Sequence, residues 1–276
     1  MLQLLHSKAL HCERLFYCLL TILAGLLAPV TVFAEPLCAA THIDRTAQVR
    51  YVHDGDTLHL ASGEKIRLIG INTPELARDG RPAQPLALAA RDRLRALVKQ
   101  SQHRIGLRFD EQRKDRYGRT LAHLYDAQGN SLSARLLEDG LATLLAVPPN
   151  LTGLDCYARV ERTARLQKRG LWQLRRYRVV DARRLSRKAR GYHPVEGKIL
   201  RVGEGRRNLW LNLRGDIAFR IDKRDINYFP GIDLRSLTGR TVIGRGWLYT
   251  RKGERRMRLR SAYDLQILPV SLDHTD

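Results

Sequence analysis

Acidic residues are scarce in this chain. Asp and Glu number 28 against 49 Lys and Arg, which gives the 276 residues a formal net charge of +21. Hydrophobic residues make up 43%, so the composition excludes a disordered chain and indicates a globular one. Because the basic residues are spread through segments with folded patterns, the charge favours nucleic acid over an acidic membrane surface as partner. The alternative is that the charge serves only solubility.

Cysteine is also scarce, and its spacing excludes a zinc site. Of the four cysteines, Cys12 and Cys18 lie in the N-terminal 34 residues, and Cys38 and Cys156 follow. No two of them have the spacing of zinc ligands. In an oxidising compartment the last two are able to form one disulfide. Because sequence gives no distance between them, two free thiols remain the alternative.

The N-terminus carries a long apolar run over 15–34, preceded by Lys8 and Arg14. With a small residue at its end, this pattern predicts a secretory signal peptide over 1–34, cleaved after Ala34. The run is about long enough to span a bilayer, so an uncleaved membrane anchor is the alternative. We expect a secreted or periplasmic protein without stable membrane association after cleavage.

Beyond the signal, short alternating patterns predict strands, and longer periodic ones predict helices. The first set of strands is 48–53, 57–60, 65–71, 104–109 and 120–125, and the helices are 83–99, 131–139 and 151–169. Gly140 and Gly170 follow the last two helices, as expected for helix ends. No internal repeat or low-complexity tract appears.

Strand patterns resume in the C-terminal part. They cover 195–202, 208–213, 217–221, 241–249, 255–260 and 265–268, with an excursion at 225–237. Such a series predicts a small all-β barrel of the oligonucleotide-binding (OB) kind over 195–270. The arginine-rich stretch 175–194 before it is either a solvated linker or a nucleic-acid contact.

Four aromatic residues lie in these C-terminal strands. They are Trp210, Phe219, Trp247 and Tyr249. Each is either a platform for a stacked base or part of the barrel core, and the apolar surroundings favour the core for most of them.

The stretch 52–75 gathers oxygen-bearing side chains at both ends of an expected hairpin. Asp54 is assigned only to the Asp-Gly turn, and the segment 72–75 taken alone is typical of a helix start. Arg67 changes this interpretation because it interrupts a hydrophobic strand, and an unpaired buried guanidinium costs several kcal/mol. It therefore needs an anionic partner, either fixed or exchangeable.

A second arginine, Arg119, follows Gly118, which tolerates the positive φ that would turn the next side chain back toward the sheet. Together with the oxygen-bearing side chains of 52–75, the two arginines indicate a site for a hard cation and a phosphate.

Three segments resemble the active-site blocks of the staphylococcal nuclease (thermonuclease) family, in order and in approximate spacing. They read His-Asp-Gly-Asp-Thr-Leu at 53–58, Ile-Arg-Leu-Ile-Gly-Ile-Asn-Thr-Pro-Glu at 66–75 and Asp-Arg-Tyr-Gly-Arg-Thr-Leu-Ala at 115–122. The resemblance covers about 48–172. It implies a mainly β, α+β fold with a five-stranded OB-fold barrel and three helices over 35–174. It also implies calcium-dependent cleavage of DNA and RNA phosphodiesters.

The resemblance assigns roles position by position. Asp56 matches a calcium-ligating aspartate, and Thr73 matches a residue that binds the metal through its backbone carbonyl. Glu75 matches the glutamate proposed to activate the attacking water. Arg67 and Arg119 match the arginines that bind the phosphate. These roles suit the chemistry, since one Ca²⁺ ion takes oxygen ligands and arginine binds phosphate bidentately.

Two departures from the family matter. Asn72 stands where the family has a second metal-binding aspartate; its amide oxygen is still a ligand, but the lost charge predicts weaker calcium binding. The family's nucleotide-stacking tyrosines are replaced by residues 146–149, Ala-Val-Pro-Pro. Tyr117 remains from the aromatic part of the pocket, and we add Arg113 as a further substrate-binding candidate. Base contacts are then weaker, or the C-terminal domain supplies them.

We therefore predict a monomeric, calcium-dependent nuclease of low sequence specificity that acts on DNA, RNA or both. The alternative is a non-catalytic nucleic-acid-binding protein of the cell envelope. Asn72 argues for that alternative, whereas Arg67, Glu75 and Arg119 argue against it. A structural envelope protein would explain the signal but not the charge pattern.

Overall fold

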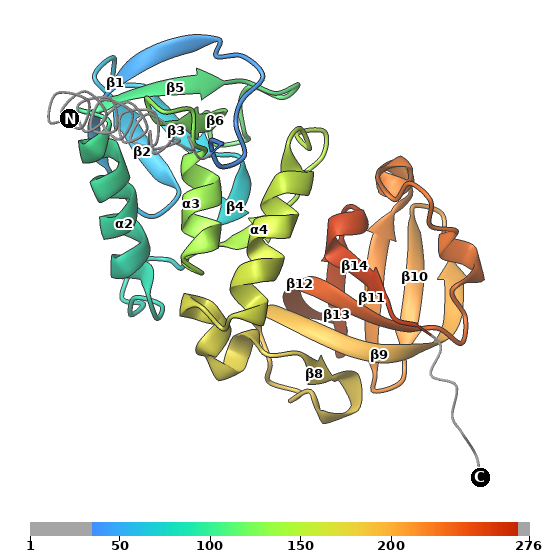
Figure 1. Cartoon of the computed structure of the whole chain (residues 1–276). Helices are drawn as coiled ribbons and strands as arrows, with labels where there is room; N and C mark the ends of the chain where they lie inside the picture. Colours follow the sequence, from blue (N-terminus) through green and yellow to red (C-terminus); the bar gives the residue numbers. More distant parts are fainter. Residues whose placement is uncertain (1–34, 270–276) are drawn as a thin grey trace, which may run out of the picture. The chain divides into compact units, whose positions relative to one another are not determined.

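Five strands in the first half of the chain close into a barrel. β1 (Arg45–Val52) pairs with β2 (Thr57–Leu60), and β2 pairs with β3 (Lys65–Leu68). β3 runs parallel to β6 (Thr120–Tyr125), which pairs with β5 (Arg104–Arg108), and β5 returns to β1 (Figure 1). This is the strand order of an OB-fold, so the predicted five-stranded barrel is confirmed.

The computed structural model describes residues 35–269. The signal peptide predicted at 1–34 lies outside the described residues. Within 35–269, no helix combines the length and the apolar character needed to cross a membrane.

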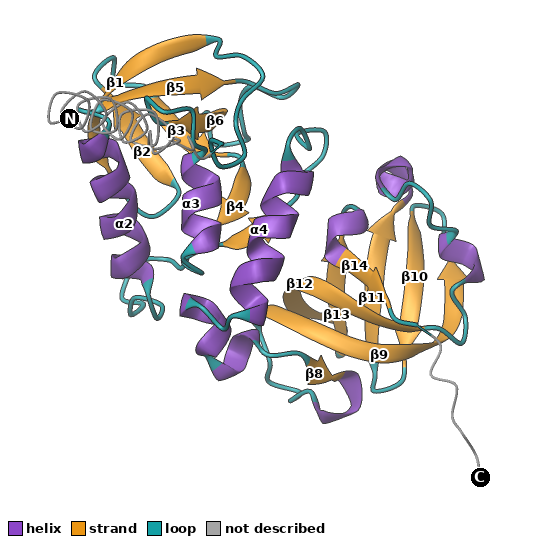
Figure 2. Ribbon diagram, viewed as in Figure 1, coloured by secondary structure: helices purple, strands orange, loops and turns teal. Residues whose placement is uncertain are grey.

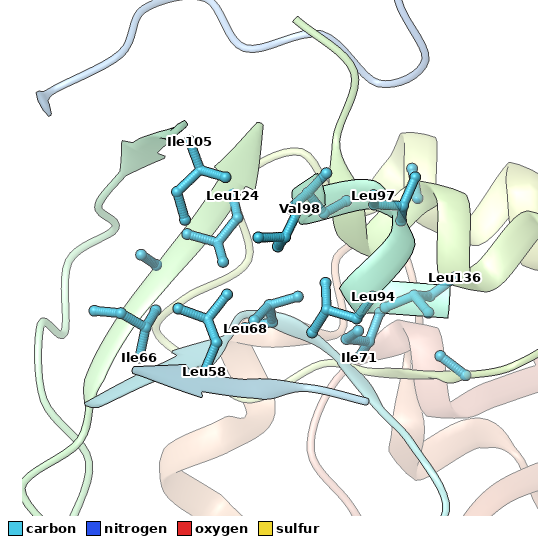
Figure 3. Close-up of a cluster of buried hydrophobic side chains, with 14 of the residues drawn as sticks. Leu58, Ile66, Leu68, Ile71, Leu94, Leu97, Val98, Ile105, Leu124 and Leu136 are labelled. Atoms are coloured by element: carbon cyan, nitrogen blue, oxygen red, sulfur yellow. The ribbon is translucent and has the colours of Figure 1, made fainter. Parts of the chain in front are cut away.

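Apolar side chains alternate along the strands of the first barrel and fill its interior. Figure 3 shows side chains of β2, β3, β5 and β6 meeting helix α2 (Ala87–Gln100) in one apolar cluster. The fully buried members include Leu58, Ile66, Ile105 and Leu124. Burying a side chain of this size contributes about 1.5–3 kcal/mol, so the cluster holds the strands that carry the candidate site.

Three helices accompany this barrel, as predicted: α2, α3 (Leu132–Glu138) and α4 (Leu154–Leu166) (Figure 2). Residues 72–75, which taken alone are typical of a helix start, do not begin a helix, because α2 begins only at Ala87. The strand predicted at 65–71 is interrupted at Ile69.

After Ile69 the chain continues as β4 (Gly70–Asn72), which pairs with β7 (Thr143–Leu145) in a ribbon that the sequence pattern did not predict. A disulfide joins Cys38 to Cys156 of α4, with 5.7 Å between the Cα atoms. The alternative of two free thiols is therefore wrong.

The C-terminal part forms a second barrel with the same strand order. β9 (Gly191–Glu204) pairs with β10 (Asn208–Leu213), and β10 pairs with β11 (Ile217–Asp222). β11 runs parallel to β13 (Glu254–Leu259), β13 pairs with β12 (Thr241–Arg251), and β12 closes onto β9. The predicted small OB-like barrel is confirmed.

Short elements complete the second barrel. β14 (Leu265–Ile267) pairs with β12, and β8 (Val180–Asp181) runs parallel to β9. The excursion at 225–237 contains two 3₁₀ turns, η4 (Lys223–Tyr228) and η5 (Leu234–Ser236). Of the four aromatics considered above, Phe219 is fully buried in the core, Trp210 and Tyr249 are half-buried, and Trp247 is 39% exposed. The prediction that most of them belong to the barrel core is therefore wrong.

The arginine-rich stretch 175–194 is folded along much of its length. It contains η2 (Arg175–Tyr177), β8, η3 (Ala182–Arg184) and the beginning of β9. Ala182 and Leu185 are buried in the core of the second barrel, so this part of the stretch packs on the barrel.

Aromatic side chains connect the two barrels, and the described residues 36–269 form one compact unit. Trp172, at the end of the first domain, meets Tyr177 edge to face at 5.9 Å between ring centroids. Tyr177 lies 5.6 Å from Tyr192 of β9, which lies 5.3 Å from Trp247. Aromatic pairs of this geometry stabilise a contact beyond the area they bury.

Candidate active site

A pocket of about 710 Å³ lies on the outer side of the first barrel, where the β1–β2 turn, β3, β4 and the loop before β6 meet. Six of the predicted site residues line it: Asp56, Arg67, Asn72, Glu75, Tyr117 and Arg119. Thr73 is buried beside Asp56. Arg113 is not among the lining residues; its guanidinium lies 4.6 Å from the ring centroid of Phe109.

Asp56 is held by backbone and side-chain donors from the segment after β4. It is only 6% exposed, and its Oδ2 accepts hydrogen bonds from the Thr73 amide at 2.9 Å and hydroxyl at 3.0 Å. Gly55 makes this approach possible: a Cβ there would lie 2.7 Å from Ala90 Cβ and 2.8 Å from Thr73 Cβ. The turn therefore packs against α2 and fixes one carboxylate in the pocket.

Arg67 has the fixed anionic partner that its place in an apolar strand requires. Its Nη2 lies 3.2 Å from Asp56 Oδ2, and the guanidinium donates to the carbonyls of Leu68 and Ile71 at 2.6 and 2.9 Å. The side chain is 11% exposed. Several partners thus hold the guanidinium at the pocket wall, in a fork geometry that suits a phosphate.

Asp54 caps the turn, as predicted, because its Oδ1 accepts from the Asp56 amide at 3.0 Å. It also lines the pocket. Burial, and then the charge of Asp56, raise the pKa of Asp54 to about 6. The carboxyl groups of Asp54 and Asp56 therefore disfavour each other's ionisation, and a bound cation would stabilise both in the charged form.

Arg119 is oriented by the loop before β6. Gly118 has φ 78, the positive value predicted from its position. Asp115 Oδ2 accepts from Arg119 Nε at 2.7 Å and lies 2.7 Å from Nη2. Burial opposes ionisation of Asp115, but the hydrogen bonds from Arg119 and Tyr117 outweigh it and lower the pKa of the carboxyl. Arg119 thus reaches the pocket as a fixed cation.

Tyr117 is the exposed aromatic of the pocket, at 68%. The guanidinium carbon of Arg116 lies 4.7 Å from its ring centroid, and that of Arg119 lies 5.5 Å away. A ring with this exposure and these neighbours is able to stack on a nucleobase.

The oxygen atoms around Asp56 fit a hard cation, but this set of ligands carries little negative charge. Among residues 35–269, no three His, Cys, Asp or Glu side chains gather in a metal-binding group. Asp56, the Asn72 amide oxygen and the Thr73 carbonyl would hold such a cation, and this set of oxygen ligands suits calcium. Asn72 Nδ2 donates to that carbonyl at 3.0 Å, so calcium binding would have to replace this contact.

Sequence reasoning missed several polar residues that line the pocket, among them two at its rim and two from the second barrel. Gln112 and Asn150 fix its rim, since the Asn150 side chain accepts from the Gln112 amide and donates to its carbonyl, both at 2.8 Å. Arg258 and Arg260 come from the second barrel. A signal for these two was present, because arginines alternate with apolar residues along 256–260 and such alternation puts them on one strand face.

Comparisons with known proteins agree with this geometry. The family model described as "Staphylococcal nuclease homologue" matches residues 65–174. The thermonuclease of Staphylococcus intermedius is 30% identical over 128 residues, which cover 45% of this chain and 74% of that protein. The thermonuclease of Staphylococcus hyicus is 32% identical over 132 residues, 47% of this chain and 76% of that protein. Endonuclease YncB of Bacillus subtilis is 34% identical over 124 residues, 43% and 57% of the two chains. This chain therefore belongs to the staphylococcal nuclease family.

Proposed function

We propose that this protein is a calcium-dependent nuclease that hydrolyses phosphodiester bonds of DNA, RNA or both with low sequence specificity. Membership of the staphylococcal nuclease family supports the general activity, that of a hydrolase acting on phosphodiesters. The observation that carries the finer proposal is the meeting of Asp56, Arg67, Glu75 and Arg119, from three separate segments, in one pocket.

The arginines bind the scissile phosphate. Arg67 approaches the pocket from β3 and Arg119 from the loop before β6; each is oriented by a carboxylate, so both are in place before substrate arrives. Arginine does not lose its proton near neutral pH, so Arg119 stabilises charge on the phosphoryl oxygens and does not act as an acid.

Glu75 is the proposed general base. It is exposed, it lines the pocket, and no ion pair engages its carboxylate within the described part of the chain. It takes a proton from the attacking water as the new P–O bond forms and the scissile P–O bond breaks, and the leaving oxygen takes its proton from solvent water. Asp56, Asn72 and the Thr73 carbonyl would hold calcium, which when bound supplies positive charge that neutralises and orients the phosphate.

Low sequence specificity follows because the pocket mainly contacts the phosphate backbone. The pocket presents guanidinium groups for the backbone phosphate and one exposed aromatic ring, Tyr117, for a base. Phosphate contacts position a nucleic acid but carry no sequence information.

We further propose export to the cell surface, the periplasm or the medium. The predicted signal peptide at 1–34 supports it, and so does the disulfide between Cys38 and Cys156, because disulfides persist in oxidising compartments.

The proposal is tested by digestion of single-stranded DNA, duplex DNA and RNA with calcium or with EDTA. We expect cleavage only with calcium, and we expect Glu75→Gln to lower the rate by about 10²–10⁴-fold, the usual contribution of a general base. Glu111→Gln is the matched control, since Glu111 is exposed but does not line the pocket. Nucleic-acid binding without calcium-dependent cleavage would refute the enzyme and support the non-catalytic alternative.

A further inference from the structure

We propose that the second barrel is part of the substrate site, and that the outer face of β13 guides a single strand of nucleic acid from the catalytic pocket to Trp210. The inference rests on the proposed function and extends it to a domain that the family resemblance does not cover.

The first observation is that the second barrel reaches the catalytic pocket. Arg258 and Arg260 line the same pocket as Asp56 and Glu75. Tyr263, which follows β13, joins the two domains: it packs against the first barrel's core and donates to Asp155 of α4 at 2.7 Å. A phosphate bound by Arg67 and Arg119 therefore lies in a pocket that two more guanidinium groups share.

The second observation is the pattern along β13. Met257 and Leu259 are fully buried in the barrel, so Arg256 and Arg258 fall on the outer face of β13, and Arg260, directly after the strand, continues the alternation. Successive residues of this face are about 7 Å apart along a strand. This is close to the spacing of phosphates in an extended nucleic-acid chain, so one arginine is able to meet one phosphate after another.

Cross-strand register carries the basic face from β13 to Trp210. Arg258 lies opposite Arg220 of β11, and Arg220 lies opposite Trp210 of β10. Directly paired residues of neighbouring strands share a face of the sheet. We call the outer-face set Trp210, Arg220, Arg256, Arg258 and Arg260 the basic strip.

The charges of the basic strip are only partly balanced by the side chains of residues 35–269. Arg258 pairs with Asp225 at 2.8 Å and Arg256 with Glu254, but Arg220 and Arg260 make no ion pair within residues 35–269. Like charges directly opposite each other destabilise a sheet. The Nε atoms of Arg220 and Arg258 are buried without a hydrogen-bond partner in the described chain. An anionic ligand along the strip would relieve the repulsion between the paired arginines.

Trp210 offers an aromatic surface on which an unpaired base of a single strand is able to stack. It is half-buried at a second hollow of the surface, and the Arg256 guanidinium lies 4.7 Å from its ring centroid. A tryptophan ring next to an arginine stacks on an unpaired base, and the bases inside a duplex are not available for such stacking. It would also replace the stacking tyrosines that the segment 146–149 lacks.

The test measures binding in the full chain carrying Glu75→Gln, with calcium, using fluorescently labelled DNA strands of about 4 and about 20 nucleotides, which bracket one OB-fold site. We expect Trp210→Leu to weaken binding of the long strand about tenfold and to narrow the long-to-short affinity ratio, with Trp210→Phe recovering most of the loss. Arg260→Gln is expected to lower the slope of log affinity against log salt by about 0.7, the value for one phosphate of a single strand.

The control is Arg183→Gln, which removes the same charge from an exposed arginine of η3 that lines neither hollow. It should change long-strand affinity by less than about twofold, since it lies outside the basic strip. Melting curves identify any variant that fails to fold, and Trp210→Leu and Arg260→Gln each decide the question alone.

Long-strand binding by either variant that equals the parent's, or that falls no more than with Arg183→Gln, would overturn the proposal. Equal losses on duplex DNA of the same length would overturn its assignment to single strands. The proposed activity fails by a different result, namely absence of cleavage by the protein that retains Glu75, so the two failures are distinguishable.

Discussion

The disulfide is expected to supply a large share of the stability of the nuclease domain. Cys38 and Cys156 are 118 positions apart in sequence. In the chain-entropy model, closing a loop of that length removes about 5 kcal/mol of conformational entropy from the unfolded state at 25 °C. Whole proteins are stable by only about 5–15 kcal/mol, so losing this cross-link should leave the domain marginal.

Replacing both cysteines by serine isolates this effect. Both side chains are half-buried, so their loss leaves little cavity and the change acts on the unfolded chain. Urea denaturation should show the free energy of unfolding lowered by about 5 kcal/mol, and Cys38→Ser alone or reduction of the native protein should lower it equally. A loss below about 1 kcal/mol would refute the reasoning.

Two further predictions concern charge. Asn72→Asp adds a carboxylate to the proposed metal ligands and should lower the calcium concentration for half-maximal activity about tenfold. Asn208→Asp adds the same charge in β10 and should leave that concentration unchanged. Equal values for Asn72→Asp and the parent would contradict the role of Asn72. Burial raises the pKa of Asp264 from 3.8 to about 7. The folded state then keeps a proton that the unfolded state loses, so the contribution of Asp264 to stability is complete below about pH 4 and is lost as the pH rises to 7. Asp264→Asn should match the parent at pH 4 and exceed its unfolding free energy at pH 8 by at most about 4 kcal/mol, and a difference independent of pH would contradict this.

Local patterns in the sequence predicted most of the fold. Alternation located the barrel strands, because one face of each strand packs against the core, and the residue period of α2 did the same for the helix. The sequence missed the break of the strand at Ile69 and the pairing of β4 with β7. That pairing joins segments about 70 residues apart, and no local period encodes such a partner.

The candidate site divides in the same way. Arg67 was recognisable because a guanidinium in an apolar strand requires an anion, and the structure provides Asp56. The approach of Arg258 and Arg260 to this pocket was not predictable, since it depends on how the second barrel contacts α4 through Tyr263. Sequence patterns place a side chain on a face, but they do not say which other domain that face meets.

The two barrels share a strand order but differ in the turn between their first two strands. This difference explains why the first barrel is proposed to cleave and the second only to bind. Arg67 on β3 and Arg220 on β11 both face outward from the third strand of a barrel, next to a parallel neighbour. In the first barrel the turn between the first two strands carries Asp54 and Asp56, which place carboxylates beside the arginine. In the second barrel the corresponding turn, 205–207, reads Gly-Arg-Arg. The second barrel thus keeps basic groups that attract a phosphate, and its turn has no carboxylate in the place of Asp54 and Asp56, so it is suited to hold a strand that the first barrel cuts.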